Sequence, residues 1–182
     1  MIPTDLAKQV DENPDIGRQI RCGCSAFVGV LSENNANRLV AVQAISRGTK
    51  LFRIEGERTE TPTRYSLQIG KNLHLDLTGE HGAEEIFDRY FWRFLNHSCA
   101  PNTLIRDQDV IAIRDIATEE DVTFNYNTTE YAMFEPFECR CGDPSCIKVV
   151  RGFKYLTVAQ QMRLRPILAP YLIGLLDRDA NA

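Results

Sequence analysis

Three cysteines stand close together in the segment FECRCGDPSC, which runs from Phe137 to Cys146. The spacing C-x-C-x4-C belongs to Cys139, Cys141 and Cys146. Three is an odd number for a disulfide framework, in which cysteines pair. A structural zinc site prefers thiolate ligands and almost always has four of them in a tetrahedron. The segment therefore predicts a zinc site that takes its fourth ligand from elsewhere in the chain.

Several residues are candidates for that fourth ligand, because distance along the chain does not decide which side chains converge. They are Cys22, Cys24, Cys99, His74, His81 and His97. Cys99 has the most distinctive surroundings, since it stands in RFLNHSCAPN, where polar residues gather between apolar flanks. Such a segment must satisfy its polar groups by turn hydrogen bonds or by a ligand. Taken alone, it favours a polar turn with one buried cysteine, and the pair Cys22 and Cys24 is interpreted as ordinary free thiols on a turn.

The elements that must position these residues are short strands. Runs rich in β-branched and aromatic residues, broken by polar turns, predict strands in a mainly β protein with minor α content. The expected strands cover residues 27–31, 38–45, 50–56, 64–70, 73–77, 103–106, 110–116 and 120–127. Helical spacing predicts a short helix within 79–95. Residues 157–179, with Pro166 and Pro170, predict two short helices or one kinked helix.

The composition is that of a soluble globular protein of one domain, with or without a small appendage. The chain has 182 residues, is 43% hydrophobic and carries a formal net charge of −4. This charge argues against a general nucleic-acid binder and permits a lysine-rich partner. The polar N-terminal stretch and the absence of a long apolar run predict no membrane contact. We expect an intracellular protein of the cytoplasm or nucleus, not a secreted one, and leave its oligomeric state open.

Three segments, taken in order, resemble the SET-domain protein lysine methyltransferases. They are RFLNHSCAPN, EDVTFNYN and CRCGDPSC, and the resemblance extends over about residues 26–156. It implies the SET fold, in which several small sheets surround a pseudoknot, here followed by C-terminal helices. The expected parts are an N-terminal tail or short helix (1–25), the SET domain (26–135), a post-SET zinc segment (136–156) and a helical extension (157–182).

The resemblance also implies an activity and a ligand set. It predicts that Cys99 joins Cys139, Cys141 and Cys146 around one structural zinc ion. It further implies methyl transfer from S-adenosylmethionine to a lysine amine of a protein or peptide. Among the catalytic positions, Tyr126 would stand at the transfer point and Phe124 would tune the product towards di- or trimethyl-lysine. Tyr65 would line the peptide side of the channel.

The cofactor side shows both agreement with the family and a departure from it. The resemblance assigns Asn96, His97, Arg93 and Phe153 to the cofactor. Where the family has G-x-G before L-F-A, however, this chain has Ala36, Asn37 and Arg38. Glycine permits a close backbone approach that arginine does not. The alternative hypothesis is therefore a SET-fold, zinc-binding interaction module that has lost its cofactor and its catalysis.

Overall fold

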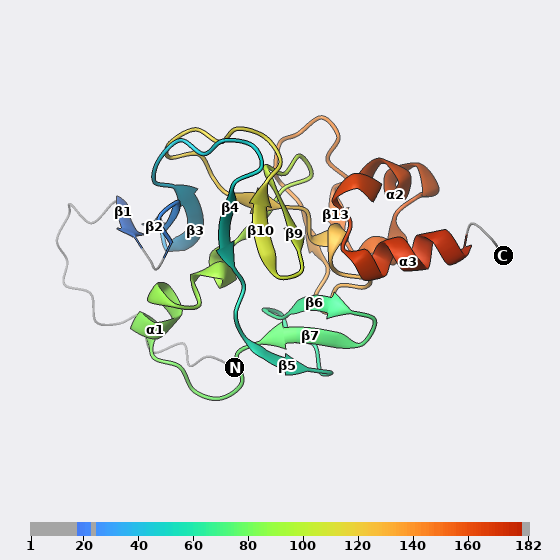
Figure 1. Ribbon diagram of the computed structural model, residues 1–182, viewed down its shortest axis with the longest axis horizontal. Coiled ribbons are helices and arrows are strands. Elements are labelled where there is room, and N and C mark those ends of the chain that lie inside the picture. The colour runs from blue at the N-terminus through green and yellow to red at the C-terminus, as the bar shows by residue number, and fades with distance from the viewer. Residues whose placement is uncertain (1–17, 23–24, 180–182) are drawn as a thin grey trace.

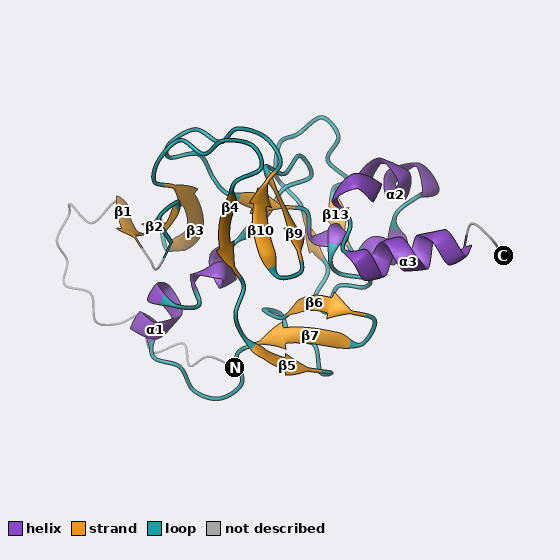
Figure 2. Cartoon of the chain, in the orientation of Figure 1, coloured by secondary structure: helices purple, strands orange, loops and turns teal. Residues whose placement is uncertain are grey.

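The computed structural model describes residues 18–22 and 25–179, in which small sheets are joined by long loops (Figures 1 and 2). The strands are β1 (Arg18–Cys22), β2 (Val28–Glu33), β3 (Ala36–Ala41), β4 (Lys50–Arg53), β5 (Glu57–Thr59), β6 (Leu67–Gly70), β7 (Leu73–Asp76), β8 (Asn96–His97), β9 (Thr103–Arg106), β10 (Asp109–Ala112), β11 (Thr123–Phe124), β12 (Phe137–Glu138) and β13 (Val149–Val150). The α-helices are α1 (Ala83–Asp88), α2 (Val158–Leu164) and α3 (Pro170–Asp179). Short 3₁₀ helices are η2 (Phe91–Phe94), η3 (Tyr126–Thr128), η4 (Phe153–Tyr155) and η5 (Arg165–Ile167).

Three antiparallel sheets form most of the body. Their strand orders are β1-β2-β3, β4-β10-β9 and β5-β7-β6. The β2–β3 hairpin turns at Asn34 and Asn35, whose φ values of 51° and 59° lie in the left-handed region. Asparagine tolerates this region better than most residues, and two-residue hairpin turns of this kind require it. The local sequence therefore fixes the register of β3, including the positions of Ala36 to Arg38.

A parallel strand pair ties distant segments into a knot. Strand β8 pairs with β11, with Asn96 opposite Thr123 and His97 opposite Phe124. The N–H of Ser98 extends this pairing by donating to the carbonyl of Phe124 at 3.0 Å. Parallel neighbours need a long crossover, which the β9–β10 hairpin supplies here. The pairing carries the NHSC segment alongside the segment that contains Tyr126.

Within the described part of the chain, the buried apolar side chains form two clusters. The larger lies among the sheets and η2 and includes Val30, Leu39, Val110 and Trp92. The smaller contains Phe153, Leu164, Leu168, Leu172 and Leu176. Leu172 and Leu176 lie four residues apart within α3, so this helix presents an apolar face to the cluster. In Figure 1, α2 and α3 lie together at one end of the molecule, beside β13.

The C-terminal helices are joined to the segment that follows Tyr126. The N–H of Ala169, just before α3, donates to the carbonyl of Thr128 at 2.8 Å. The hydroxyl of Tyr171 also donates to the carbonyl of Thr129. The helical extension therefore supports the chain immediately beyond β11.

The predicted mainly β architecture is confirmed, while several local expectations differ from the structure. The strand expected over 120–127 is limited to β11, because the side chain of Asn125 accepts the N–H of Asn127 and begins η3. Residues 18–22, expected as part of a tail or short helix, form β1 on the edge of the first sheet. Residues 1–17 and Cys24 lie outside the described residues. No helix in the described ranges is long and apolar enough to cross a membrane.

The backbone of Gly152, just before η4, packs closely against the backbone of residues 131–133. Gly152→Ala is therefore expected to destabilise the protein by about 3 kcal/mol or more. Gly152 has a φ of 105°, and an added Cβ would lie 2.7 Å from Ala132 Cα and 2.8 Å from the carbonyl oxygen of Tyr131. Urea denaturation measures the loss. The matched control is Gly142→Ala, which has a φ of 76° but open space around the added methyl. Equal losses in the two variants would contradict the crowding argument.

Candidate active site and metal centre

Four thiols converge at one end of the knot. The sulfurs of Cys99, Cys139, Cys141 and Cys146 all lie within 4.8 Å of one another, and none forms a disulfide. The sulfurs of Cys99 and Cys139 are 3.8 Å apart. A tetrahedron with Zn–S bonds of about 2.3 Å has sulfur–sulfur edges of about 3.8 Å. The cluster therefore has the ligands and the spacing to hold zinc, and its fourth member is the cysteine of NHSC.

Local turns present the three C-terminal cysteines to Cys99. The N–H of Cys139 donates to the carbonyl of Lys148 at 2.7 Å, which joins the two sides of the segment next to β12 and β13. Asp143 accepts the N–H of Ser145 at 2.7 Å, and its carbonyl accepts the N–H of Cys146 at 2.9 Å. Burial raises the pKa of the Cys99 thiol, and the charges of the neighbouring thiolates raise that pKa further. A bound cation would reverse this repulsion, since zinc binds the thiolate form.

His97 links the cysteine cluster to Tyr126. Its Nδ1 accepts the backbone N–H of Tyr126 at 3.1 Å, and its Nε2 lies 3.3 Å from the sulfur of Cys99. Burial lowers the pKa of His97 to about 4, so the ring is neutral near pH 7. With Nδ1 accepting, the single ring proton lies on Nε2 and faces the sulfur. The His97 side chain therefore contacts both the cysteine cluster and the backbone of Tyr126, and it fixes their relative positions.

Tyr126 is fixed at the base of an aromatic pocket. Its hydroxyl donates to the carbonyl of Leu95 at 3.0 Å, and its ring lies 4.8 Å from that of Phe124. Burial raises the pKa of Tyr126 to about 12, so the hydroxyl keeps its proton near neutral pH. Because the hydroxyl donates its hydrogen bond to the carbonyl of Leu95, the lone pairs of the phenol oxygen remain available to a donor such as an amine.

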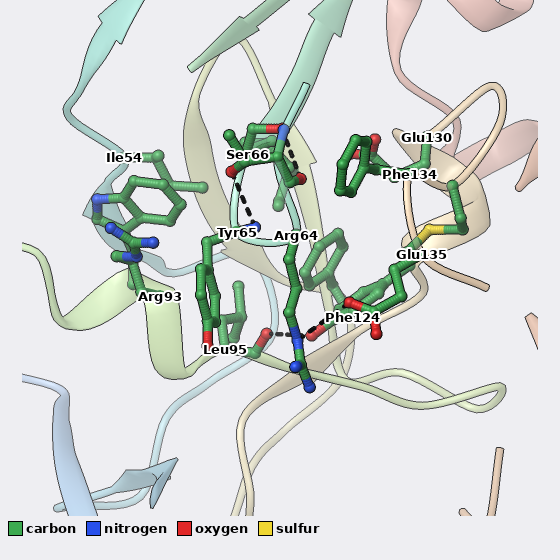
Figure 3. A pocket seen from close by; sticks show the side chains of 16 residues that line it. Ile54, Arg64, Tyr65, Ser66, Arg93, Leu95, Phe124, Glu130, Phe134 and Glu135 are labelled. Carbon is green, nitrogen blue, oxygen red and sulfur yellow. Dashed lines mark hydrogen bonds and ion pairs between the residues drawn. The ribbon is translucent and has the colours of Figure 1, made fainter. Parts of the chain in front are cut away.

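The pocket itself is narrow and lined by rings. Figure 3 shows Tyr65 and Arg93 on one side and Phe134 and Glu130 on the other. The predicted catalytic positions Tyr126, Phe124 and Tyr65 all line it. Its volume is about 80 Å³, far below the several hundred Å³ that a drug-sized ligand needs. The pocket accepts a single side chain and is too small for a nucleoside cofactor.

Glu130 is one of the pocket residues that the sequence did not reveal. It follows Tyr126 by four positions, and its side chain is buried at 8% exposure. Burial raises its pKa to about 7, although the N–H of Gln68 and the hydroxyl of Thr129 oppose the rise. No local signal distinguishes this glutamate, because the segment NTTEY reads as a polar loop.

Two residues expected at the cofactor have identifiable side-chain contacts of their own in the structure. The guanidinium of Arg93 lies over the ring of Tyr65 at 4.5 Å and is 4.0 Å from the carboxylate of Asp76, on the pocket side. Phe153 is 3% exposed inside the smaller apolar cluster. Leucines of α2 and α3 pack against this ring, so Phe153 serves as a core residue of the helical end of the molecule.

The remaining cofactor positions lie on or near the knot. Asn96 is exposed and His97 is partly buried in β8. Ala36 and Asn37 are exposed at the start of β3. The side chain of Arg38 makes ion pairs with Glu33 at 2.8 Å and Asp121 at 2.9 Å. Two of the three positions are thus exposed residues, while the side chain of Arg38 is ion-paired with its own neighbours.

Comparisons with known proteins identify the class. The family model described as "SET domain" matches residues 29–127, which is more than half of the chain. The variant-silencing SET domain-containing protein of Plasmodium falciparum is 30% identical over 147 residues, covering 76% of this chain and 5% of that protein. An H3 lysine-36 specific histone-lysine N-methyltransferase of Mycosarcoma maydis is 34% identical over 109 residues, covering 56% of this chain and 10% of that protein. Methyltransferase flvH of Aspergillus flavus is 26% identical over 147 residues and is covered over 75% of its length.

A solved structure agrees on the fold. The crystal structure of KRYPTONITE in complex with mCHG DNA and S-adenosylhomocysteine matches with a TM-score of 0.50 and 21% identity, over 65% of this chain and 27% of that one. The chain belongs to the SET-domain protein lysine methyltransferase family, and its four-cysteine cluster is consistent with a post-SET zinc site. It spans a tenth or less of the first two curated relatives named above.

Proposed function

We propose that this protein transfers methyl groups from S-adenosylmethionine to the side-chain amine of a lysine in a protein substrate. The observation that carries the proposal is the position of Tyr126, whose hydroxyl is anchored on Leu95 within a narrow pocket lined by aromatic rings. The relatives support it, since two fungal ones are named histone-lysine N-methyltransferases specific for H3 lysine 36. A histone or another lysine-containing protein is therefore the proposed substrate class.

The pocket residues have complementary parts in this reaction. A lysine arm fills the space between the rings, and the ring faces attract its positive head. Exclusion of water favours the neutral amine, because burial lowers the pKa of an ammonium. Tyr126 accepts a hydrogen bond from the amine and orients its lone pair. Phe124 leaves room that a tyrosine hydroxyl would occupy, which favours di- or trimethyl-lysine as product.

The cofactor and the metal have separate roles. S-adenosylmethionine supplies the methyl group as an electrophile, and Asn96, His97 and the backbone of Ala36 and Asn37 are the residues proposed to hold it. One structural zinc ion on the four cysteines closes the site on the side of Cys99. Four thiolates leave no open coordination position, so this metal stabilises the fold and takes no part in methyl transfer.

Calorimetric titration of zinc-loaded protein with S-adenosylmethionine tests the proposal. We expect a dissociation constant near 1 μM, roughly −8 kcal/mol, and about tenfold weaker binding in Asn96→Ala. Labelled S-adenosylmethionine with core histones then tests transfer to lysine. The titration is repeated with a lysine-rich peptide present, since peptide can complete a site of this kind.

The ion pairs of Arg38 favour one alternative function, a non-catalytic interaction module. Glycine is absent from positions 36 to 38, and the Arg38 side chain is ion-paired with Glu33 and Asp121. Absence of cofactor binding with and without peptide, in folded and zinc-loaded protein, would support this module and overturn the enzyme. Gain of binding in Arg38→Gly would then identify the hairpin as the cause.

A further inference from the structure

The side chain of Glu130 is held firmly at the pocket wall. Its Oε1 accepts the N–H of Gln68 at 2.8 Å. Its backbone N–H donates to Tyr126 and its carbonyl accepts from Phe153, both at 2.8 Å. These contacts join Glu130 to β6, η3 and η4, and the bond from Gln68 holds the carboxylate in the pocket that Tyr126 also lines.

The carboxylate of Glu130 lacks a cation from its own chain. The two arginines that line the pocket have other carboxylate partners, with Arg64 at 3.4 Å from Glu135 and Arg93 at 4.0 Å from Asp76. Within residues 18–22 and 25–179, Glu130 makes no ion pair, and its Oε2 makes no hydrogen bond. Burying a charge without a partner costs several kcal/mol. The site is therefore built for a proton or for a cation from outside the chain.

The shape of the pocket selects the kind of cation. Tyr65, Phe124, Tyr126 and Phe134 line a space of about 80 Å³ that also contains Glu130 on its wall. Aromatic faces attract alkylammonium groups, and an unbranched alkyl arm packs between rings. A carboxylate at such a wall gives the charged head a hydrogen-bonding partner. A primary alkylammonium satisfies both the rings and the acid.

We propose that the carboxylate of Glu130 binds the ε-ammonium of the target lysine and accepts a proton from it, an inference that rests on the proposed function. An N–H bond of the ammonium breaks and an O–H bond forms on Oε2. The electron pair stays on nitrogen as the lone pair that the reaction needs. S-adenosylmethionine is the co-substrate that this amine meets, and Glu130 returns its proton to solvent after product leaves.

The surroundings of Glu130 suit a proton acceptor near neutral pH. Burial raises its pKa to about 7, so protonated and ionised forms coexist there. The groups that face it are the Gln68 amide, the Thr129 hydroxyl and the phenols of Tyr126 and Tyr171. Burial raises the pKa of both phenols above the usual range, and the charge of Glu130 adds to the rise. The phenols therefore stay neutral, and Glu130 is the group that changes charge.

Titration with n-butylammonium, which reproduces the lysine arm and head, tests the inference without turnover. We expect Glu130→Gln to weaken n-butylammonium binding about tenfold or more, while binding of the uncharged 1-pentanol stays unchanged. Glutamine keeps an oxygen for the N–H of Gln68, so the wall is preserved. The matched control Glu84→Gln removes an exposed carboxylate of α1, outside the pocket lining, and is expected to change little. Equal binding by wild type and Glu130→Gln would overturn the proposal.

A second readout isolates proton exchange from packing. At pH 7, binding of n-butylammonium to the wild type is expected to release a fraction of a proton, because the cation favours the ionised carboxylate. Calorimetry in buffers of different ionisation enthalpy measures this release, which Glu130→Gln abolishes. Wild-type binding without proton release would contradict the titrating role of Glu130. Failure to bind S-adenosylmethionine would instead overturn the proposed function, so the two failures are distinguishable.

Stability measurements verify that Glu130→Gln folds. Because the pKa of Glu130 is raised in the native protein, its stabilising contribution is present below about pH 4.5 and lost as the pH rises through about 7. Glutamine carries no charge, so the variant avoids the cost of burying an ionised carboxylate at pH 8. It is therefore expected to be at least as stable as wild type at that pH. A fall in kcat/KM in a well-folded variant then reports on the reaction.

Discussion

Removal of zinc is expected to unfold the segment from Phe137 to Arg151 while the larger apolar cluster persists. Strands β12 and β13 are two residues long, and most of this segment is exposed. Structural zinc contributes on the order of 10 kcal/mol at sites of four ligands, which exceeds what two short strands supply. Hydrogen exchange measures the change: protection falls over 137–151 and over the NHSC segment, and stays over β2, β3 and β10.

Cys139→Ser gives the same result without a chelator, because a serine hydroxyl is a poor zinc ligand. Cys139 is the buried member of the cluster, so its loss also removes the sulfur that faces Cys99 at 3.8 Å. The matched control is Cys22→Ser in β1, at the edge of the first sheet, which is expected to keep one equivalent of zinc. Retention of one tightly bound zinc in Cys99→Ala would show that the fourth ligand is another residue.

Tyr126→Phe is expected to lower kcat/KM by about 100-fold or more while S-adenosylmethionine still binds. The change removes a single oxygen, which both anchors the ring on Leu95 and offers lone pairs to the amine. The stability cost should be only about 1 kcal/mol, the usual contribution of one hydrogen bond. Single-turnover kinetics with labelled cofactor separates this loss of chemistry from any loss of binding.

The control for this prediction is Tyr155→Phe, which removes an exposed phenol hydroxyl in η4 and leaves the pocket intact. Tyr155→Phe should keep the wild-type rate. If Tyr126→Phe also kept it, the pocket would not be the place where the methyl group moves, and the proposed function would need another site.

The parts that sequence predicted well are those in which residue type dictates chemistry. Thiols have few uses in a reduced protein, so C-x-C-x4-C indicated a metal cluster before any geometry was known. The NHSC and FNY segments were identifiable because their order resembles that of a family. Short strands were also predictable, since turns such as Asn34-Asn35 interrupt β-branched runs at regular intervals.

The parts that sequence missed depend on tertiary packing. Glu130 is buried because the segment before it is bonded to the C-terminal helices through Thr128 and Thr129, and no local pattern encodes this. Phe153 reads equally as a core residue or a stacking platform until α2 and α3 cover it. Arg93 has both an acid and a ring within reach, and only the fold selects Asp76 and Tyr65.

The wide separation of the cluster's cysteines along the chain also sets an order of assembly. Cys99 and Cys139 are 40 positions apart, and Cys146 comes later still. On the ribosome, every residue of the pocket is made before the last thiol that closes the cluster. A nascent chain can therefore form the larger sheets before Cys146 has been added, but it cannot yet complete the four-cysteine cluster next to Tyr126. Closure of the cysteine cluster around a metal ion is therefore expected to be a late step in the folding of newly made protein.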